Sequence, residues 1–183
     1  GNLEYVVKTL VKDCHIASQR WDILAIPGVE LTHLPKDHID EAAKEAKALG
    51  AKLVNVHGET IVEPVEPGTN RAALTSSSVD LLAHPGLLTQ DEARLATETG
   101  TFLEISARRG HSLANGHVVR MALASNALLV LDSDAHEPAD LLEPERAQEI
   151  AAGAGLSEDE VETVLTINPG KLLQRLGITY PRA

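Results

Sequence analysis

The chain has 183 residues, of which 43% are hydrophobic, so it can bury one good core and we expect a single domain over residues 1–183. Its 16 lysines and arginines stand against 27 acidic residues, and the net charge of −11 disfavours non-specific binding to nucleic acid or acidic membranes. A single cysteine and the absence of a long apolar run exclude a disulfide scaffold and a membrane span, and we expect a cytoplasmic protein.

The first predicted element is a helix from residue 2 to about 19, because Leu3, Val6, Val7, Leu10 and Val11 follow helical spacing. The chain enters this helix directly from Gly1, without an initiator methionine. We therefore expect the amino-terminal part of the domain to be incomplete.

Strand-like and helical segments then alternate five times, which predicts an α/β fold with a parallel sheet and helical crossovers. Two helix starts carry capping boxes, at Thr89 and Ser157, and Gly50 is a fitting helix end. The predicted strands cover residues 22–31, with an interruption at Pro27 and Gly28, and residues 52–56, 79–83, 102–105 and 127–131. The main predicted helices cover residues 36–49, 71–74, 89–98, 117–124, 143–152 and 171–176.

Residues of metal-ligand type recur at the carboxyl ends of these strands. Strand ends in a parallel sheet share one face, so side chains far apart in sequence converge there. Mixed imidazole and carboxylate ligands suit zinc, manganese or iron. The candidate metal ligands are Glu30, His57, His84, Asp134 and His136. His33 and Glu104 are candidates for a supporting role behind the ligands, with a solvent-exposed loop histidine as the alternative for His33.

Arg108, Arg109 and His111 follow the fourth predicted strand and are the candidate catalytic residues. A guanidinium group at the mouth of a metal site can hold a phosphate group through two hydrogen bonds. The alternative for both arginines is a solvated basic turn. The polar stretch 58–70 after His57 is also of interest, because long ordered loops in compact α/β domains are more often functional than decorative.

The ordered segments IPGVELTH, VHGETIVEPVEPGTNRAA, LLAHPG, LEISARRGHSLANGH and SDAH resemble the PHP (polymerase and histidinol phosphatase) superfamily, in its branch of stand-alone histidinol-phosphate-phosphatase-like domains. The resemblance covers residues 2 to about 165. It implies a distorted (β/α)7 TIM-like barrel, here missing the first two strands with their H-x-H and Asp-His ligands, so that five parallel strands are visible. It also implies two or three divalent metal ions in a complete member, with Glu30 bridging two of them.

The resemblance implies a metal-dependent phosphoesterase that hydrolyses a small phosphate monoester such as histidinol phosphate, with no nucleic-acid or membrane partner. A second hypothesis is a catalytically impaired metal-binding or interaction module derived from the PHP scaffold. A third is a PHP domain that serves a DNA polymerase, which the acidic composition disfavours. The sequence leaves open whether the chain forms a homo-oligomer.

Overall fold

A computed structural model describes residues 2–179 and shows a sheet of five parallel strands that lie side by side in chain order. The predicted α/β fold with five parallel strands is therefore confirmed. Gly1, where the sequence indicated that an amino-terminal part is missing, lies outside the described residues. The strands are β1 (Gly28–Leu31), β2 (Leu53–His57), β3 (Leu81–Ala83), β4 (Phe102–Ser106) and β5 (Leu129–Asp132).

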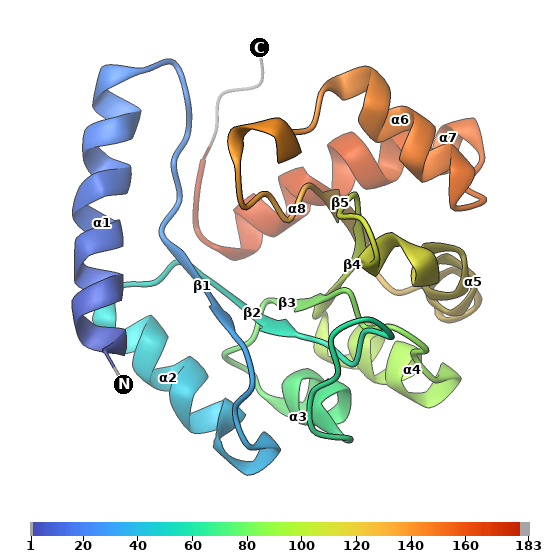
Figure 1. Ribbon diagram of the computed structural model, residues 1–183, viewed down its shortest axis with the longest axis horizontal. Coiled ribbons are helices and arrows are strands. Elements are labelled where there is room, and N and C mark those ends of the chain that lie inside the picture. Colours follow the sequence, from blue (N-terminus) through green and yellow to red (C-terminus); the bar gives the residue numbers. More distant parts are fainter. Residues whose placement is uncertain (1, 180–183) are drawn as a thin grey trace.

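Helices surround the sheet as an arc that runs from α1 past α2, α3, α4 and α5 to α6 and α7 (Figure 1). Both predicted capping boxes are present, at Thr89 with Glu92 and at Ser157 with Glu160, and Gly50 ends α2 in the left-handed conformation. The helices are α1 (Leu3–Arg20), α2 (Ile39–Leu49), α3 (Thr69–Thr75), α4 (Gln90–Thr99), α5 (Asn115–Ser125), α6 (Pro144–Gly153), α7 (Glu158–Glu162) and α8 (Asn168–Arg175). Short helical turns lie at η1 (Lys36–His38), η2 (His111–Ala114), η3 (Pro138–Asp140) and, with π geometry, η4 (Thr163–Ile167).

The first strand is shorter than its predicted range of 22–31. Residues 22–27 lie outside β1, and the backbone oxygen of Pro27 accepts a hydrogen bond of 2.8 Å from the amide of Lys52 just before β2. Proline has no amide hydrogen with which to extend a ladder. Trp21, just before this segment, and Ile23 within it are exposed.

Alternation along the strands separates an apolar outer face from an inner face that becomes polar toward the carboxyl ends. On β2 and β4, the outer positions Val54, Val56, Leu103 and Ile105 are buried in the main core beneath the helices. The inner positions of β3, β4 and β5 begin with a small apolar cluster of Leu81, Phe102 and Val130, against which Leu172 of α8 packs. Two residues further along β4 and β5 the same face carries Glu104 and Asp132. The chain thus fills the inner face with apolar side chains at one end and with ionisable groups at the other.

Within the described residues, β1 pairs only with β2, so the sheet has an open edge at its first strand. Helix α1 contacts β1 and α2, and it leaves Tyr5, Val6 and Ile16 exposed. None of the described helices is both long enough and apolar enough to cross a membrane.

Candidate metal centre

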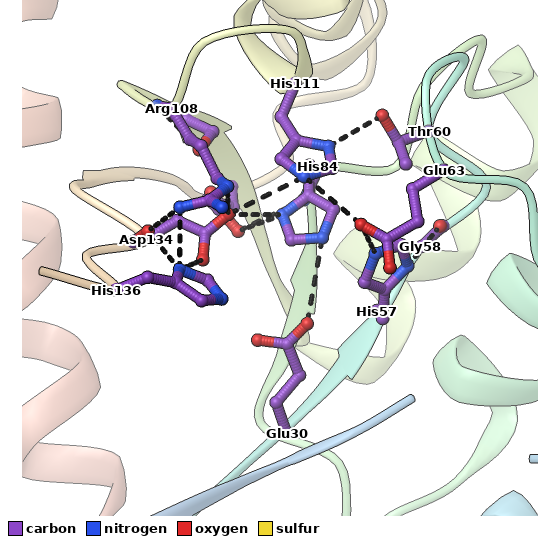
Figure 2. A network of polar contacts seen from close by, with 12 residues as sticks. Glu30, His57, Gly58, Thr60, Glu63, His84, Arg108, His111, Asp134 and His136 are labelled. Atoms are coloured by element: carbon purple, nitrogen blue, oxygen red, sulfur yellow. Dashed lines mark hydrogen bonds and ion pairs between the residues drawn. The ribbon is translucent and has the colours of Figure 1, made fainter. Parts of the chain in front are cut away.

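A cavity of about 230 Å³ lies at the carboxyl ends of the strands, where the sequence predicted a cluster of ligands. Figure 2 shows imidazole and carboxylate groups from different strands and loops pointing toward one another. The cavity is lined by Glu30, Thr32, His57, Glu63, His84, Arg108, His111, Asp134 and His136. Of the candidates taken from the sequence, Arg109, His33 and Glu104 are not among the lining residues.

Three buried histidines form the centre of this cavity. His57, His84 and His111 each offer one ring nitrogen, and these three nitrogens lie within 4.8 Å of one another. The rings of His84 and His111 stack with their centroids 4.1 Å apart, and His57 meets His84 edge-on at 4.5 Å. Each of these residues is at most 6% exposed, so the three imidazoles are largely buried. This geometry could hold a metal ion.

The hydrogen bonds of these rings leave nitrogen atoms available for a cation. Nδ1 of His57 lies 3.0 Å from the carbonyl oxygen of Gly58, which can only accept, so that nitrogen carries the proton and Nε2 keeps its lone pair. Nε2 of His57 and both ring nitrogens of His84 are buried without a hydrogen-bond partner. Buried polar atoms in proteins normally have a partner. The orphaned nitrogens therefore fit a bound divalent cation.

The electrostatics of the cluster favour neutral imidazoles, which are the form that binds metal. Burial lowers the pKa of His84 against the opposing pull of nearby carboxylates, Glu30 first among them. Burial also lowers the pKa of His111, and the neighbouring His84 adds to that effect. Both rings are thus held ready to ligate at neutral pH.

Carboxylates stand on either side of the histidines. Oε1 of Glu30 is 3.7 Å from Nε2 of His84, while its other oxygen accepts a hydrogen bond of 2.9 Å from the side chain of Asn55. Oδ2 of Asp134 lies 3.8 Å from Nε2 of His111 and 4.0 Å from Nδ1 of His84. Both carboxylates are near enough to reach a cation after small movements of their side chains.

Glu63 also belongs to this group, although it was not selected from the sequence. Its Oε2 lies 3.6 Å from Nε2 of His57 and 3.9 Å from Nε2 of His111, and its Oε1 lies 3.4 Å from Nε2 of His33. Burial alone would raise the pKa of Glu63, but His57, followed by His33 and His111, holds it below the ordinary value. The available signal was the polar loop after His57, which contains this glutamate.

Glu104 and Asp132 lie on the inner face beneath the histidines. Oε2 of Glu104 is 3.2 Å from Nδ1 of His84 and accepts a hydrogen bond of 3.1 Å from the backbone amide of that residue. Burial raises the pKa of Glu104 to about 7 and raises that of Asp132 well above its usual range. Glu104 therefore contacts His84 from behind, as a supporting residue would. Asp132 was missed, although the alternation of β5 places it on the same face.

The backbone is strained at the turns that present these side chains. His84, Asp134 and His33 have positive φ angles of 30°, 48° and 54°, a backbone conformation that residues other than glycine seldom adopt. Such strain persists where the surrounding structure enforces it, and it is concentrated at functional sites. At His84 and Asp134 the residue follows the end of its strand and its side chain lines the cavity.

Arg108 is engaged by the site's own residues. Its Nη1 donates to Nδ1 of His136 at 2.7 Å and to the backbone oxygen of Asp134 at 3.1 Å. It also lies 3.7 Å from carboxylate oxygens of Asp134 and Asp140. Nδ1 of His136 also lies 3.0 Å from the backbone oxygen of Asp134, so Arg108 and His136 both contact the turn that carries Asp134. Arg109 is exposed and lines a neighbouring hollow with Arg108, His136, Glu137 and Asp140.

Comparison with known proteins gives relatives at two levels of similarity. The chain is 43% identical over 173 residues to the uncharacterized protein MJ1295 of Methanocaldococcus jannaschii, covering 94% of this chain and 79% of that protein. It is 29% identical over 152 residues to ribonuclease P protein component 3 of both Methanosarcina mazei and Methanosarcina acetivorans. This match covers 75% of the chain and 64% of the length of each component. No family model matches the chain.

Among solved structures, a chain of archaeal ribonuclease P with mature tRNA superimposes with a TM-score of 0.75 at 16% identity, over 92% of this chain and 76% of that one. An amidohydrolase superimposes with a TM-score of 0.57 at 16% identity, over 92% of this chain and 46% of that enzyme. At these identities the likeness is one of fold. It relates the five-stranded sheet to the TIM-barrel-like architecture expected from the sequence.

These similarities correct two expectations. The expected phosphomonoesterase acting on a small phosphorylated substrate such as histidinol phosphate is wrong, because the named relatives are components of ribonuclease P. The expected absence of nucleic acid is wrong for the same reason, since the similar solved chain stands in a complex with tRNA. A fold and its cluster of ligands do not fix a function. Net charge, moreover, governs non-specific attraction to nucleic acid rather than assembly through particular surfaces.

Proposed function

The chain belongs to the family of the uncharacterized protein MJ1295, and we propose that it is a metal-binding component of an RNA-processing ribonucleoprotein of the ribonuclease P kind. The observation that carries this proposal is the 29% identity to ribonuclease P protein component 3, which extends over 75% of the chain. The similarity in fold to a chain of archaeal ribonuclease P supports it. In this function the chain acts within an assembly and is not a phosphatase on its own.

The surface around the cavity suits contact with another protein. Ile61, Val62, Leu87 and Leu113 are exposed apolar residues on the loops that follow β2, β3 and β4. The first and third of these loops touch, because Thr60 Oγ1 lies 2.9 Å from Nδ1 of His111. Grouped apolar side chains on a surface mark interaction sites. With a net charge of −11 on the chain, protein contacts are a better means of joining a ribonucleoprotein than general attraction to RNA.

The metal-binding part of the proposal rests on the donor set. His57, His84 and His111 would hold the cation, with Glu30 and Asp134 beside them and His136 at the edge. Zinc, manganese and iron all suit such ligands. When bound, the cation supplies positive charge among these carboxylates and joins β2 and β3 to the loop that carries His111. Glu104 would keep the ring of His84 in place from behind.

The test is isolation of the assembly from the native host. A tagged chain should bring down an RNA and ribonuclease P proteins, and removal of the chain should slow maturation of precursor tRNA. Leu113→Asp, at a residue that is 70% exposed on the rim, should reduce this recovery. Tyr5→Asp, at a residue that is 66% exposed on α1, is the matched control and should leave recovery unchanged. Isolation of the chain without such RNA or proteins, together with normal tRNA maturation in its absence, would contradict the assembly.

A further inference from the structure

We propose that Glu63 is the fourth ligand of the cation held by His57, His84 and His111, and that binding of the cation fixes the loop of residues 58–68 over the site. The inference rests on the metal-binding part of the proposed function and is independent of the ribonucleoprotein part. It adds to the three histidines a carboxylate from a segment that lies outside every strand and helix.

The distances fit a shared cation. Metal–ligand bonds of about 2.0–2.2 Å in a tetrahedron place neighbouring ligand atoms roughly 3.3–3.6 Å apart. Oε2 of Glu63 lies 3.6 Å from Nε2 of His57 and 3.9 Å from Nε2 of His111. The three ring nitrogens lie within 4.8 Å of one another, so the most separated pair must approach by roughly 1 Å to share a cation. In Figure 2 the carboxylate of Glu63 faces this group of rings.

The charge partners of Glu63 distinguish it from Asp134. Among the described residues its ion-pair contacts are to three histidines, His33, His57 and His111, and it contacts no lysine or arginine. Asp134, by contrast, lies 3.7 Å from the guanidinium of Arg108, which already supplies a positive charge. Among the described residues, Glu63 lacks a permanently charged partner of this kind. A divalent cation would provide one and would also satisfy the orphaned nitrogens of His57 and His84.

The loop is anchored at its two ends and has no backbone anchor at its tip. Glu59 receives hydrogen bonds at Oε1 from the amides of Gly68 and Asn70, at 2.9 and 3.0 Å, and donates its own amide to the side chain of Asn70 at 2.9 Å. Between these anchors, no backbone amide from Ile61 to Val65 donates a hydrogen bond within the described part of the chain. Residues 61–64 are exposed. The side chain of Glu63 is therefore the tip's polar link to the site, and a cation would strengthen that link.

The experiment compares the metal-free full chain, Glu63→Gln and Glu98→Gln, each titrated with Co²⁺ and with Zn²⁺. Glu98 is an exposed glutamate on α4 and undergoes the same chemical change away from the cavity. Wild type and the Glu98 variant should bind one Co²⁺ per chain with the visible absorption of a four-coordinate site. Glu63→Gln should weaken binding at least about 10-fold and alter the spectrum, because one ligand oxygen is lost.

Hydrogen exchange of the loop provides a readout that affinity alone does not. The amides of Ile61, Val62, Glu63 and Val65 should exchange more slowly after Zn²⁺ binds to wild type and to Glu98→Gln, and should show no slowing in Glu63→Gln. Equal affinity, spectrum and slowing in Glu63→Gln would overturn the inference while leaving the histidine site intact. Loss of binding in Asp134→Asn but not in Glu63→Gln would overturn it in favour of Asp134. Failure of the wild type to bind either ion would overturn both this inference and the metal-binding part of the proposed function.

Discussion

Replacing Gly86 by alanine should destabilise the protein by roughly 3 kcal/mol and loosen the loop that carries Glu63. Gly86 follows His84 and Pro85 at the end of β3 and has a φ angle of +64°. A Cβ atom at this position would lie 2.0 Å from the backbone oxygen of Glu59 and 3.0 Å from Cα of Thr60. Both are backbone atoms, so no change of side-chain rotamer can relieve the clash.

The magnitude combines two costs. An alanine held in the left-handed region costs about 1–2 kcal/mol. Forcing an additional carbon into a packed contact costs typically 1–3 kcal/mol, and here the start of the loop at residues 59–60 must move to accept it. Together these costs lower the free energy of unfolding by several times the thermal energy. The backbone that must move, at residues 59–60, leads directly to Glu63.

The assay is urea unfolding of the metal-free protein, combined with hydrogen exchange of residues 58–68. Gly170→Ala is the control, because Gly170 lies in α8 with no neighbouring atom within 4 Å of an added Cβ. It should leave stability unchanged or raise it by up to about 1 kcal/mol, since alanine favours a helix. A loss below about 1 kcal/mol for Gly86→Ala, with normal exchange in the loop, would show that the close approach of the two backbones has little energetic weight.

Three further predictions concern the buried carboxyl, the metal site and a helix cap. Glu104→Gln should stabilise the metal-free protein relative to wild type by about 3 kcal/mol above pH 7 and by little below pH 4.5. Burial raises the pKa of Glu104 in the folded protein from 4.5 to about 7, so its ionisation costs wild type stability as the pH rises between these values. Urea unfolding with a chelator at several pH values measures this, and a difference in stability that does not change with pH would contradict it. Zn²⁺ at 100 times its dissociation constant should stabilise wild type by about 2.7 kcal/mol. It should stabilise His111→Ala much less, because that variant lacks one of the buried ligands. If Zn²⁺ raised the stability of both proteins against thermal unfolding equally, His111 would be excluded as a ligand. Thr89→Ala should cost about 1 kcal/mol in the same unfolding assay, because it removes the side chain that caps α4, and an unchanged stability would indicate a cap of no consequence.

The correction of the expected function shows what a cluster of metal ligands can and cannot indicate. The sequence predicted that His57 and His84 would lie close together, and both line the same cavity. The expectation of a phosphomonoesterase needed more than the cluster. The proposed function rests instead on similarity to ribonuclease P components over 152 residues, which a set of ligands does not reveal.

Local sequence predicted the order of the strands and helices and the positions of the strand-end histidines, although the first predicted strand was too long. Alternation of strands and helices predicted the five parallel strands, and the four-residue patterns at Thr89 and Ser157 predicted two capping boxes, because a cap depends on residues three positions apart. His57 ends β2 and His84 follows β3 directly, and strand ends in a parallel sheet share one face. Both features depend on residues that are close together in the sequence, so they can be predicted from it.

Only the tertiary structure decided which other side chains join those histidines. Glu63 lies in an irregular loop, where no periodicity says which way a side chain points, and its position depends on the contact of residues 59–60 with Gly86. His111, chosen from the sequence as a catalytic candidate, stacks on His84 because the loop after β4 folds back and Thr60 contacts its ring. In each case the deciding contact joins residues far apart in sequence, so its energy is set by packing rather than by any local pattern.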